Sequence, residues 1–295
     1  MRLRNRRALM QALAITGAFF VAEVVGGILT GSLALLADAG HMLTDLGATS
    51  MALLAAWFAL RPPTARRSWG YYRLEVLTAL ANGLLLLGVV GYIAFEGVQR
   101  LRNPPEVLAG PMLAIAFAGL LANLAVVWLL LCQQKRTINV QSVLLHVLGD
   151  ALGSIGVLVA GALIVWKGWR LADPIASMFI AGILLVSVWR LLRTTADILL
   201  ESVPTHIDLR EVRESLMHLP GVIGVHDLHV WTLSTGFIAM SGHLVVERLD
   251  SQGLLVLVRE RLKHQFGIDH ATIQVETPDF PDEAVHCVGD PRCLP

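Results

Sequence analysis

Long apolar stretches alternate with short polar connections over residues 1–200 of the chain. An α-helix needs about 20 predominantly apolar residues to cross the roughly 30 Å hydrocarbon core of a bilayer. Six stretches are long and apolar enough, and segments that carry glycine, proline or charged residues separate them. These stretches are residues 8–29, 33–60, 74–99, 111–131, 141–166 and 174–193. The pattern predicts a domain of six membrane-spanning helices.

The pattern changes after Pro204, where charged residues become frequent. Apolar residues there recur at the spacing of amphipathic helices and half-buried strands. Helices are predicted over residues 206–221 and 251–267, and strands over 222–234, 237–247 and 271–277. The order helix, strand, strand, helix, strand predicts a small α+β domain whose helices cover one face of a sheet.

Together these patterns predict an α-helical membrane protein with three regions. Residues 1–200 form a six-helix transmembrane domain, residues 201–280 form a cytosolic α+β domain, and residues 281–295 form an irregular tail. Composition supports this fold class, because 55% of the 295 residues are hydrophobic and only 16% are charged. Soluble domains carry about 25% charged residues. The formal net charge of zero provides no polybasic surface for nucleic acid.

Lysine and arginine near the ends of the predicted spans indicate the orientation. Twelve fall on the side of the N-terminus, and four fall on the opposite side. The twelve are Arg2, Arg4, Arg6, Arg7, Arg61, Arg66, Arg67, Arg73, Lys135, Arg136, Arg190 and Arg193; the four are Arg100, Arg102, Lys167 and Arg170. Because the cytoplasmic side is the richer in these residues, both termini are predicted to be cytoplasmic. The expected location is the cell (inner) membrane, which the chain crosses several times.

Two polar pairs interrupt the apolar stretches at the same spacing. His41 and Asp45 lie in the second stretch, and His146 and Asp150 lie in the fifth. Residues four apart share one face of a helix, and these two helices run in opposite directions with the pairs at similar depth. Two imidazoles and two carboxylates can close a tetrahedral shell that suits Zn²⁺, at metal–ligand distances of about 2.0–2.2 Å. The four residues are therefore predicted to bind one divalent cation.

Charge balance favours this metal site. An ionisable residue at the centre of a bilayer costs about 2.5–3.5 kcal/mol on insertion scales. Two carboxylates neutralise one divalent cation, and without metal the same groups attract protons. A ligating histidine must be unprotonated, so metal and protons compete for the site. If the site faces each side of the membrane in turn, this competition produces proton-coupled antiport.

Alternative roles for the intramembrane polar residues stay open. A single histidine–aspartate pair could equally form an interhelical hydrogen bond, whereas two pairs with one spacing favour the metal site. Asp38 is a further metal-site candidate, which either supports His41 from outside the ligand shell or lies near the outer water boundary. Structural hydrogen bonds are predicted for Glu23, Asn82 and Asn123.

At these residues the sequence resembles the cation diffusion facilitator family, which exports Zn²⁺ and related metals from the cytosol. The resemblance covers about residues 8–277 and is carried by GSLALLADAGHMLTD, NVQSVLLHVLGDALGSIGV, DPIAS, ILLESVP and VHDLHVW. It implies a homodimer of six-helix protomers, each with a cytosolic ferredoxin-like domain, and a transport site at the four intramembrane residues. Members with histidine at the position of His41 resemble the zinc-transporting branch, so zinc is the implied substrate.

The resemblance also implies a cytosolic metal site that steadies the dimer, formed by His226, His243 and Glu276. The sequence places these residues on three predicted strands that are neighbours. His226 and His229 are three residues apart, so on a flat strand they face opposite sides of the sheet. A polar sheet face with ordinary histidines is the alternative interpretation.

The tail and two loops complete the candidate chemistry. His286, Cys287 and Cys293 are further zinc candidates, since thiolates suit zinc, and one hypothesis has the tail reach the site of the partner protomer. Residues 132–140 contain no histidine, and Tyr72 stands where the family often has one. Neither loop is therefore expected to bind metal.

The leading functional hypothesis is a secondary transporter that exports Zn²⁺ in exchange for protons. Cd²⁺, Co²⁺, Ni²⁺ and Fe²⁺ are alternative substrates because they accept similar ligands. An enzyme is not expected, because four protein ligands leave no coordination position for a reacting water, and no HExxH or GxSxG motif occurs. A membrane metal sensor is the third class, although an anchor needs fewer than six spans. The expected partners are metal ions, protons, the lipid bilayer and a second copy of the chain.

Overall fold

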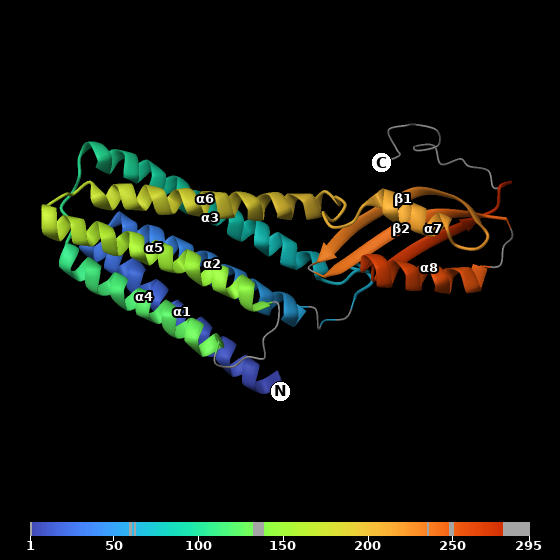
Figure 1. The fold of residues 1–295 in the computed structure, drawn as a ribbon, viewed down its shortest axis with the longest axis horizontal. Helices are drawn as coiled ribbons and strands as arrows, with labels where there is room; N and C mark the ends of the chain where they lie inside the picture. Colours follow the sequence, from blue (N-terminus) through green and yellow to red (C-terminus); the bar gives the residue numbers. More distant parts are fainter. Residues whose placement is uncertain are drawn as a thin grey trace. The chain divides into compact units, whose positions relative to one another are not determined.

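The computed structural model describes residues 2–58, 61, 63–131, 139–234, 236–247 and 251–279. At residues 2–13, 45, 48, 49, 51–58, 125–131, 139–152, 251 and 252 it describes the backbone only. The described residues form eight helices and three strands (Figure 1). These are α1 Arg2–Thr30, α2 Leu33–Phe58, α3 Tyr72–Arg102, α4 Ala109–Leu131, α5 Asn139–Lys167, α6 Ala172–Leu199, α7 Leu209–Met217, β1 Val222–Ser234, β2 Phe237–Val246, α8 Ser251–Phe266 and β3 His270–Glu276.

Contacts between residues divide the chain into two compact units. The first holds Met1–Leu60 and Leu77–Arg193, and the second holds Arg61–Val76 and Thr194–Pro295. The connection between α2 and α3 thus packs with the C-terminal residues, a long-range contact that the linear pattern did not indicate. The region boundaries at residues 200 and 280 stay predictions.

Each predicted span lies within one of the helices α1–α6, apart from residues 59 and 60, which are outside the described residues. By length and composition of the described residues, α3 and α6 are each apolar enough to cross a membrane. Shorter apolar stretches within the other four helices are Ala14–Thr30, Leu33–Thr44, Ala109–Leu124 and Gly153–Lys167. The number of membrane crossings stays a prediction.

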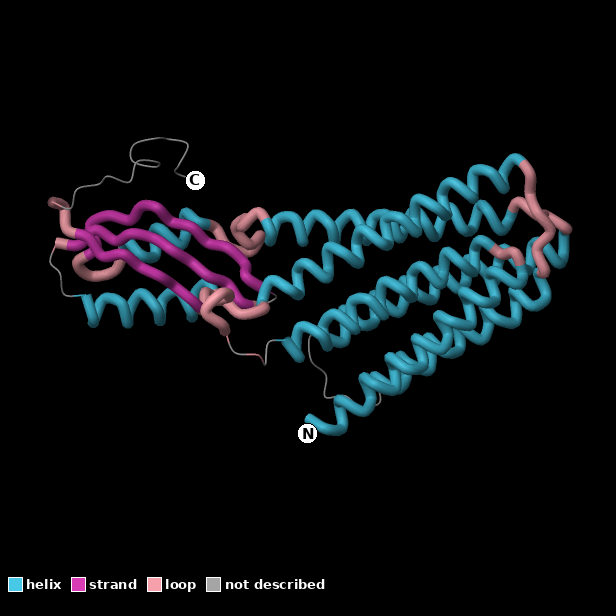
Figure 2. The backbone as a smooth tube through the Cα atoms, turned by 180° about the vertical axis from the view of Figure 1, so that it is seen from behind, coloured by secondary structure: helices cyan, strands magenta, loops and turns pink. Residues whose placement is uncertain are grey.

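The first unit is a bundle with a close-packed interior and an apolar perimeter. Helix α1 packs against α2 and α4, and α5 packs against α2 and α4 (Figures 1 and 2). The buried cluster includes Leu33, Leu35, Met112, Val157 and Leu184. Large apolar side chains also cover the outside, where Tyr92, Phe95, Phe179 and Trp189 are each more than half exposed. An apolar perimeter of this kind matches lipid better than water.

A buried carboxylate from α6 holds the start of α2. The chain reverses between α1 and α2 at Gly31, whose φ of 71° is a left-handed conformation that favours glycine. Asp173, fully buried in the first turn of α6, accepts hydrogen bonds from Ser32 Oγ at 2.6 Å, from the Leu33 amide at 2.9 Å and from the Ala34 amide at 3.2 Å. These donors are among the amides that a helix N-terminus leaves unpaired. The carboxylate therefore caps α2 from another helix.

Arg100 of α3 completes this corner of the bundle. Its guanidinium donates to the carbonyl of Gly31 at 2.5 Å and to Glu96 Oε1 at 2.9 Å. Its Nη1 also lies 3.9 Å from Asp173 Oδ2. Three helices therefore meet at the α1–α2 turn through charged groups, and this network fixes where α2 begins.

The second unit is an α+β domain with the predicted order of elements. Its sheet has the strand order β1-β2-β3, with β1 antiparallel to β2 and β2 parallel to β3. Helices α7 and α8 pack on one face of the sheet (Figure 2). The core between them includes Val212, Leu216, Val258, Leu262, Met240 and Leu244. The other face of the sheet is left for polar side chains, so the predicted one-sided arrangement is confirmed.

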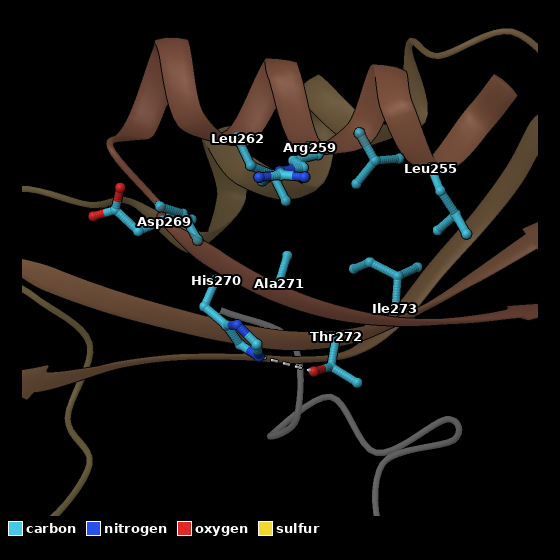
Figure 3. Close-up of a pocket in the computed structure, with 10 residues that line it drawn as sticks. Leu255, Arg259, Leu262, Asp269, His270, Ala271, Thr272 and Ile273 are labelled. Atoms are coloured by element: carbon cyan, nitrogen blue, oxygen red, sulfur yellow. Dashed lines mark hydrogen bonds between the residues drawn. The ribbon is translucent and has the colours of Figure 1, made fainter. Parts of the chain in front are cut away.

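Aromatic side chains connect the α2–α3 segment to this sheet. Tyr72 stacks on Phe237 with ring centroids 5.1 Å apart, and Trp69 meets His270 edge-on at 4.8 Å. A cavity of about 540 Å³ lies elsewhere in the unit, between α8 and β3. Figure 3 shows Ala271 and Ile273 facing α8 across it, whereas His270 projects from the opposite side of β3.

We expect Asp173→Ala to destabilise the bundle, because it leaves a hydroxyl and two backbone amides buried without an acceptor. A buried donor left unpaired costs about 1–3 kcal/mol, so the free energy of unfolding should fall by about 3 kcal/mol or more. Thermal unfolding in detergent micelles would measure the loss. Asp197→Ala, at an exposed position of the same helix, is the matched control. Equal melting temperatures for the two variants would contradict the capping role.

Candidate metal sites

The four predicted intramembrane ligands lie on two helices that contact each other. His41 and Asp45 belong to α2, and His146 and Asp150 belong to α5, which packs against α2. The side chain of His41 is half-buried. The side chains of Asp45, His146 and Asp150 lie outside the described residues, so the ligand set itself stays a prediction.

A hydrogen bond beside these positions fixes how α2 and α5 are aligned. Asp38 on α2 is 2% exposed, and its Oδ2 accepts a hydrogen bond from Ser154 Oγ on α5 at 3.0 Å. Gly153 lets the two helices come this close, because a Cβ atom at that position would overlap Asp38 Oδ1. The bond and the glycine together set the relative register of the two helices.

The levels of the predicted ligands follow from this register when residues are counted along each helix. His41 comes three residues after Asp38, and Asp150 comes four residues before Ser154. Because α2 and α5 run in opposite directions (Figure 1), both positions are expected at one level, about 5.4 Å or one turn from the hydrogen bond. Asp45 and His146 follow one turn further on. Both His–Asp pairs are therefore expected at matching levels of the same helix pair.

Among the described residues, the structural hydrogen bond predicted for Glu23 on α1 is absent at one of its two carboxyl oxygens. Its side chain is 1% exposed, and among the side chains that the structure describes none forms a hydrogen bond with Oε2. Its Oε1 lies against α4, where a Cβ atom on Gly119 would be only 2.6 Å away. The hydrogen bonds predicted for Asn82 and Asn123 stay predictions.

The three predicted cytosolic ligands come together on the open face of the sheet. His226 pairs with His243 across β1 and β2, and His243 pairs with Gln274 of β3. Glu276 lies two residues beyond Gln274 and thus on the same face. One ligand atom from each of the two histidines and Glu276 can be chosen so that all three lie within 4.8 Å of one another. Among the described residues, this is the group of histidine, cysteine and acidic side chains with metal-site geometry.

Glu276 holds the centre of this group. It is 6% exposed, with Oε2 at 3.0 Å from His226 Nε2 and Oε1 at 2.8 Å from His243 Nδ1. Gln274 donates a hydrogen bond to Oε1 at 2.8 Å and so orients the carboxylate. The Nδ1 atom of His243 is buried and its contact lacks hydrogen-bond geometry. Two imidazoles, one of which has a ring nitrogen that is unpaired among the described residues, and one carboxylate fit the preferences of Zn²⁺.

A bulge in β1 changes the expected position of His229. His226 pairs with His243 and His229 pairs with Ser241, so three steps on β1 match two on β2. The extra residue is accommodated at Asp227, whose φ is 49°. His229 therefore shares the face of His226, contrary to the flat-strand prediction.

Asp227 uses this conformation to bridge two histidines. Its Oδ1 lies 3.0 Å from His229 Nε2, and its Oδ2 lies 3.5 Å from His243 Nε2. It can thus hold the His243 ring in place from the side opposite Glu276. The tail candidates His286, Cys287 and Cys293 lie outside the described residues.

The sequence pattern did not single out Gly153, Ser154 or Asp227. Ser154 follows Asp150 by four residues and so shares its helix face, which was a signal available in the sequence. The bulge at Asp227 left no comparable signal, because bulges depend on the pairing of two strands.

Comparisons with known proteins agree with this architecture. The sequence model of the cation efflux transmembrane domain matches residues 9–200, and that of the cation efflux protein cytoplasmic domain matches residues 204–278. The zinc transporter ZitB of Escherichia coli (strain K12) is 43% identical over 274 residues, which cover 92% of this chain and 88% of that protein. The cadmium, cobalt and zinc/H(+)-K(+) antiporter of Bacillus subtilis (strain 168) is 36% identical over 290 residues, covering 96% and 93%.

One solved structure is similar to the C-terminal part of the chain. It is the metal-bound C-terminal domain of the CzcD transporter from Cupriavidus metallidurans, with 36% sequence identity. The match covers 24% of this chain and 99% of that one, with a TM-score of 0.22.

We expect Gly153→Ala to disturb the α2–α5 contact, because the added methyl group overlaps the Asp38 carboxylate. Overpacking of this kind costs about 1–3 kcal/mol, and the displaced helices should also lower zinc uptake into proteoliposomes. The matched control is Gly156→Ala on the same helix, where the nearest atom to a new Cβ is 3.8 Å away. The measurements are melting temperature in detergent and initial uptake rate. Two variants that behave alike would show that the close approach at Gly153 does not set the register.

Proposed function

The chain belongs to the zinc-transporting branch of the cation diffusion facilitator (cation efflux) family, and from this we propose that it exports Zn²⁺ from the cytosol in exchange for protons. Transport proceeds by alternating access, with one metal site that faces each side of the membrane in turn. His41, Asp45, His146 and Asp150 are the ligands. Both termini are cytoplasmic, and six helices cross the inner membrane.

The observation that carries this proposal is the register of α2 and α5. The Asp38–Ser154 hydrogen bond and the close approach at Gly153 support an arrangement in which both HxxxD pairs occupy matching levels. Two nitrogen and two oxygen ligands then surround one dehydrated cation tetrahedrally. We place Asp38 outside this ligand shell, because it already accepts the hydrogen bond from Ser154.

The relatives support the metal class and the coupling. ZitB is named a zinc transporter, and the relative from Bacillus subtilis is named an antiporter of cadmium, cobalt and zinc against protons and potassium. We propose zinc as the main substrate of this chain. Broader export of Cd²⁺, Co²⁺, Ni²⁺ and Fe²⁺ is the second candidate, because these ions accept the same ligands.

Proton exchange also supplies energy for moving Zn²⁺ out of the cell. Moving two positive charges outward against a potential of about 100 mV costs about 4.6 kcal/mol, at about 2.3 kcal/mol for each charge. One proton that returns per cycle offsets half of this, and a pH gradient adds to the driving force. The ligating histidines must lose their protons to bind metal, so the site itself couples the two ions.

A transporter is favoured over an enzyme or a sensor. The relatives named above are transporters, and a closed shell of four protein ligands leaves no position where a metal-bound water could react. A sensor needs an anchor and a metal-binding domain, but it does not need ligands inside the helix bundle. We therefore propose that the chain performs no chemical conversion.

The cytosolic unit adds a resident metal site in this proposal. His226, His243 and Glu276 bind Zn²⁺, and Asp227 and Gln274 orient the ligands through the contacts described above. The ion steadies a homodimer formed through the cytoplasmic domain. His286, Cys287 and Cys293 could complete the site of the partner protomer.

We expect Asp45→Ala and Asp150→Ala each to abolish zinc transport while the protein still inserts into the membrane. Loss of outer partners of a metal ligand already costs about 10–100-fold, so loss of a direct ligand should lower uptake by about 100-fold or more. Zinc uptake into proteoliposomes under an imposed pH gradient is the measurement. Glu106→Ala, at an 80% exposed carboxylate, is the control. Normal uptake by either aspartate variant would refute the site assignment.

We expect Glu276→Gln to remove the cytosolic ion, because an amide is a neutral and weaker ligand than a carboxylate. The substitution is best made in an Asp45→Ala background, so that zinc titration calorimetry reports the cytosolic site alone. The expected result is loss of one zinc ion per protomer. Glu247→Gln, at the exposed residue directly after β2, controls for the change of charge. Unchanged stoichiometry and affinity would leave the three residues as an ordinary polar face.

A further inference from the structure

We propose that Glu23 is a second proton-binding site of the membrane unit, which releases its proton when metal binds and regains it when metal leaves. This inference rests on the proposed antiport function and names a carrier of protons outside the metal ligands. No step of the zinc coordination itself requires Glu23, so its burial in the bundle points to a separate role.

The first observation is a buried carboxyl group with an orphaned oxygen. Glu23 lies in the middle of the apolar stretch of α1 and is 1% exposed. Among the side chains that the structure describes, none forms a hydrogen bond with Oε2. On the other side, Oε1 fills the space that Gly119 leaves by having no side chain. The site therefore accommodates the carboxyl group closely but provides no donor for Oε2.

A proton is the simplest occupant of such a site. An ionised carboxylate buried without a partner is far more costly than a neutral acid, and no Lys or Arg occurs in α1 between Ala14 and Thr30. Helix α4 carries no titratable residue between Ala109 and Leu124. A potassium ion needs several oxygen ligands around it, whereas the α4 residue that Oε1 meets is Gly119, which has no side chain. The site thus favours a proton as its occupant.

The second observation links Glu23 to the metal site. Helix α1 packs against α2, and Glu23 and Asp38 lie eight and seven residues from the turn at Gly31, so they are at similar levels of the bundle. Asp38 is in turn held by Ser154 of α5. The other titratable residues on α2 and α5 near this level are the proposed ligands His41, Asp45, His146 and Asp150. Two carboxylates that share a low-dielectric region repel each other. The negative charge on Asp38, which lies one helical turn from the proposed metal site, therefore favours the protonated form of Glu23.

The charge of the metal provides the coupling. A divalent cation bound beside Asp38 offsets negative charge in this part of the bundle, so the Glu23 carboxyl can ionise and give its proton to water. When the cation leaves, the negative charge of the carboxylates is no longer offset by the metal, and a proton returns to Glu23. One O–H bond breaks and re-forms in each cycle, and no other co-reactant is needed.

Infrared difference spectroscopy on the full-length protein tests the proposal directly. Zinc is added to protein in lipid vesicles, and the spectrum is followed for loss of the C=O band of a protonated carboxylic acid. We expect the wild type to lose such a band, and Glu23→Gln to lack this change. The control Glu106→Gln, at an exposed residue, should lose the band on zinc addition as the wild type does. Gly119→Ala retains the Glu23 carboxyl group but displaces it, so the band should persist at a shifted frequency.

Proton counting with a pH-sensitive dye provides the second readout. Glu23→Gln should release up to one proton fewer for each zinc bound, and Glu23→Asp should restore the release. If Glu23→Gln still loses the C=O band when zinc is added and releases as many protons as the wild type, the inference is wrong while antiport stands. A Gly119→Ala band at the wild-type frequency would equally overturn it. If wild-type zinc uptake moves no protons at all, the proposed antiport fails, and this inference fails with it.

Discussion

Every carboxyl group inside the helix bundle must be hydrogen-bonded, neutralised by a cation or protonated, because the apolar interior offers no water to replace its lost hydration. The membrane unit meets this constraint in different ways. Asp173 accepts hydrogen bonds from Ser32 and two backbone amides of α2, and Asp38 accepts one from Ser154. Glu23 has no such donor for Oε2 among the described side chains. The first two groups fix the structure, and the third is left to exchange a proton.

These contacts converge on α2. Its N-terminus is held by Asp173 of α6, its Asp38 is held by Ser154 of α5, and it packs against α1, which carries Glu23. A helix secured at its start and aligned with α5 can present His41 and Asp45 at a defined level. A cation site built from two helices needs this alignment, since a shift of one residue moves each side chain by about 100° around its helix. Gly153 of α5 leaves room for the Asp38 side chain of α2, and Gly119 of α4 leaves room for the Glu23 side chain of α1.

The cytosolic unit satisfies its buried carboxylate differently. Glu276 lies at the edge of the sheet core, where two imidazoles and one amide surround it. Register across the three strands brings these residues together, and the bulge at Asp227 adds a second carboxylate on the same face. Within the same unit, Trp69 and Tyr72 attach the α2–α3 segment to the sheet. The segment that follows α2 is thereby tied to the unit that carries the cytosolic site.

The sequence alone determined the helical stretches, the order of elements in the cytosolic unit and the matched spacing of the two HxxxD pairs, because apolar periodicity and i, i+4 spacing are local properties of the chain. It also pointed to His226, His243 and Glu276 through family resemblance, whereas the flat-strand expectation for His229 was wrong. Only the tertiary structure decided that Asp173 caps α2 across 140 residues, that Ser154 of α5 donates to Asp38 Oδ2, and that Glu23 lies against Gly119. Such partners depend on how helices and strands are aligned with one another, and that alignment is set by close packing between distant segments, which no local pattern records.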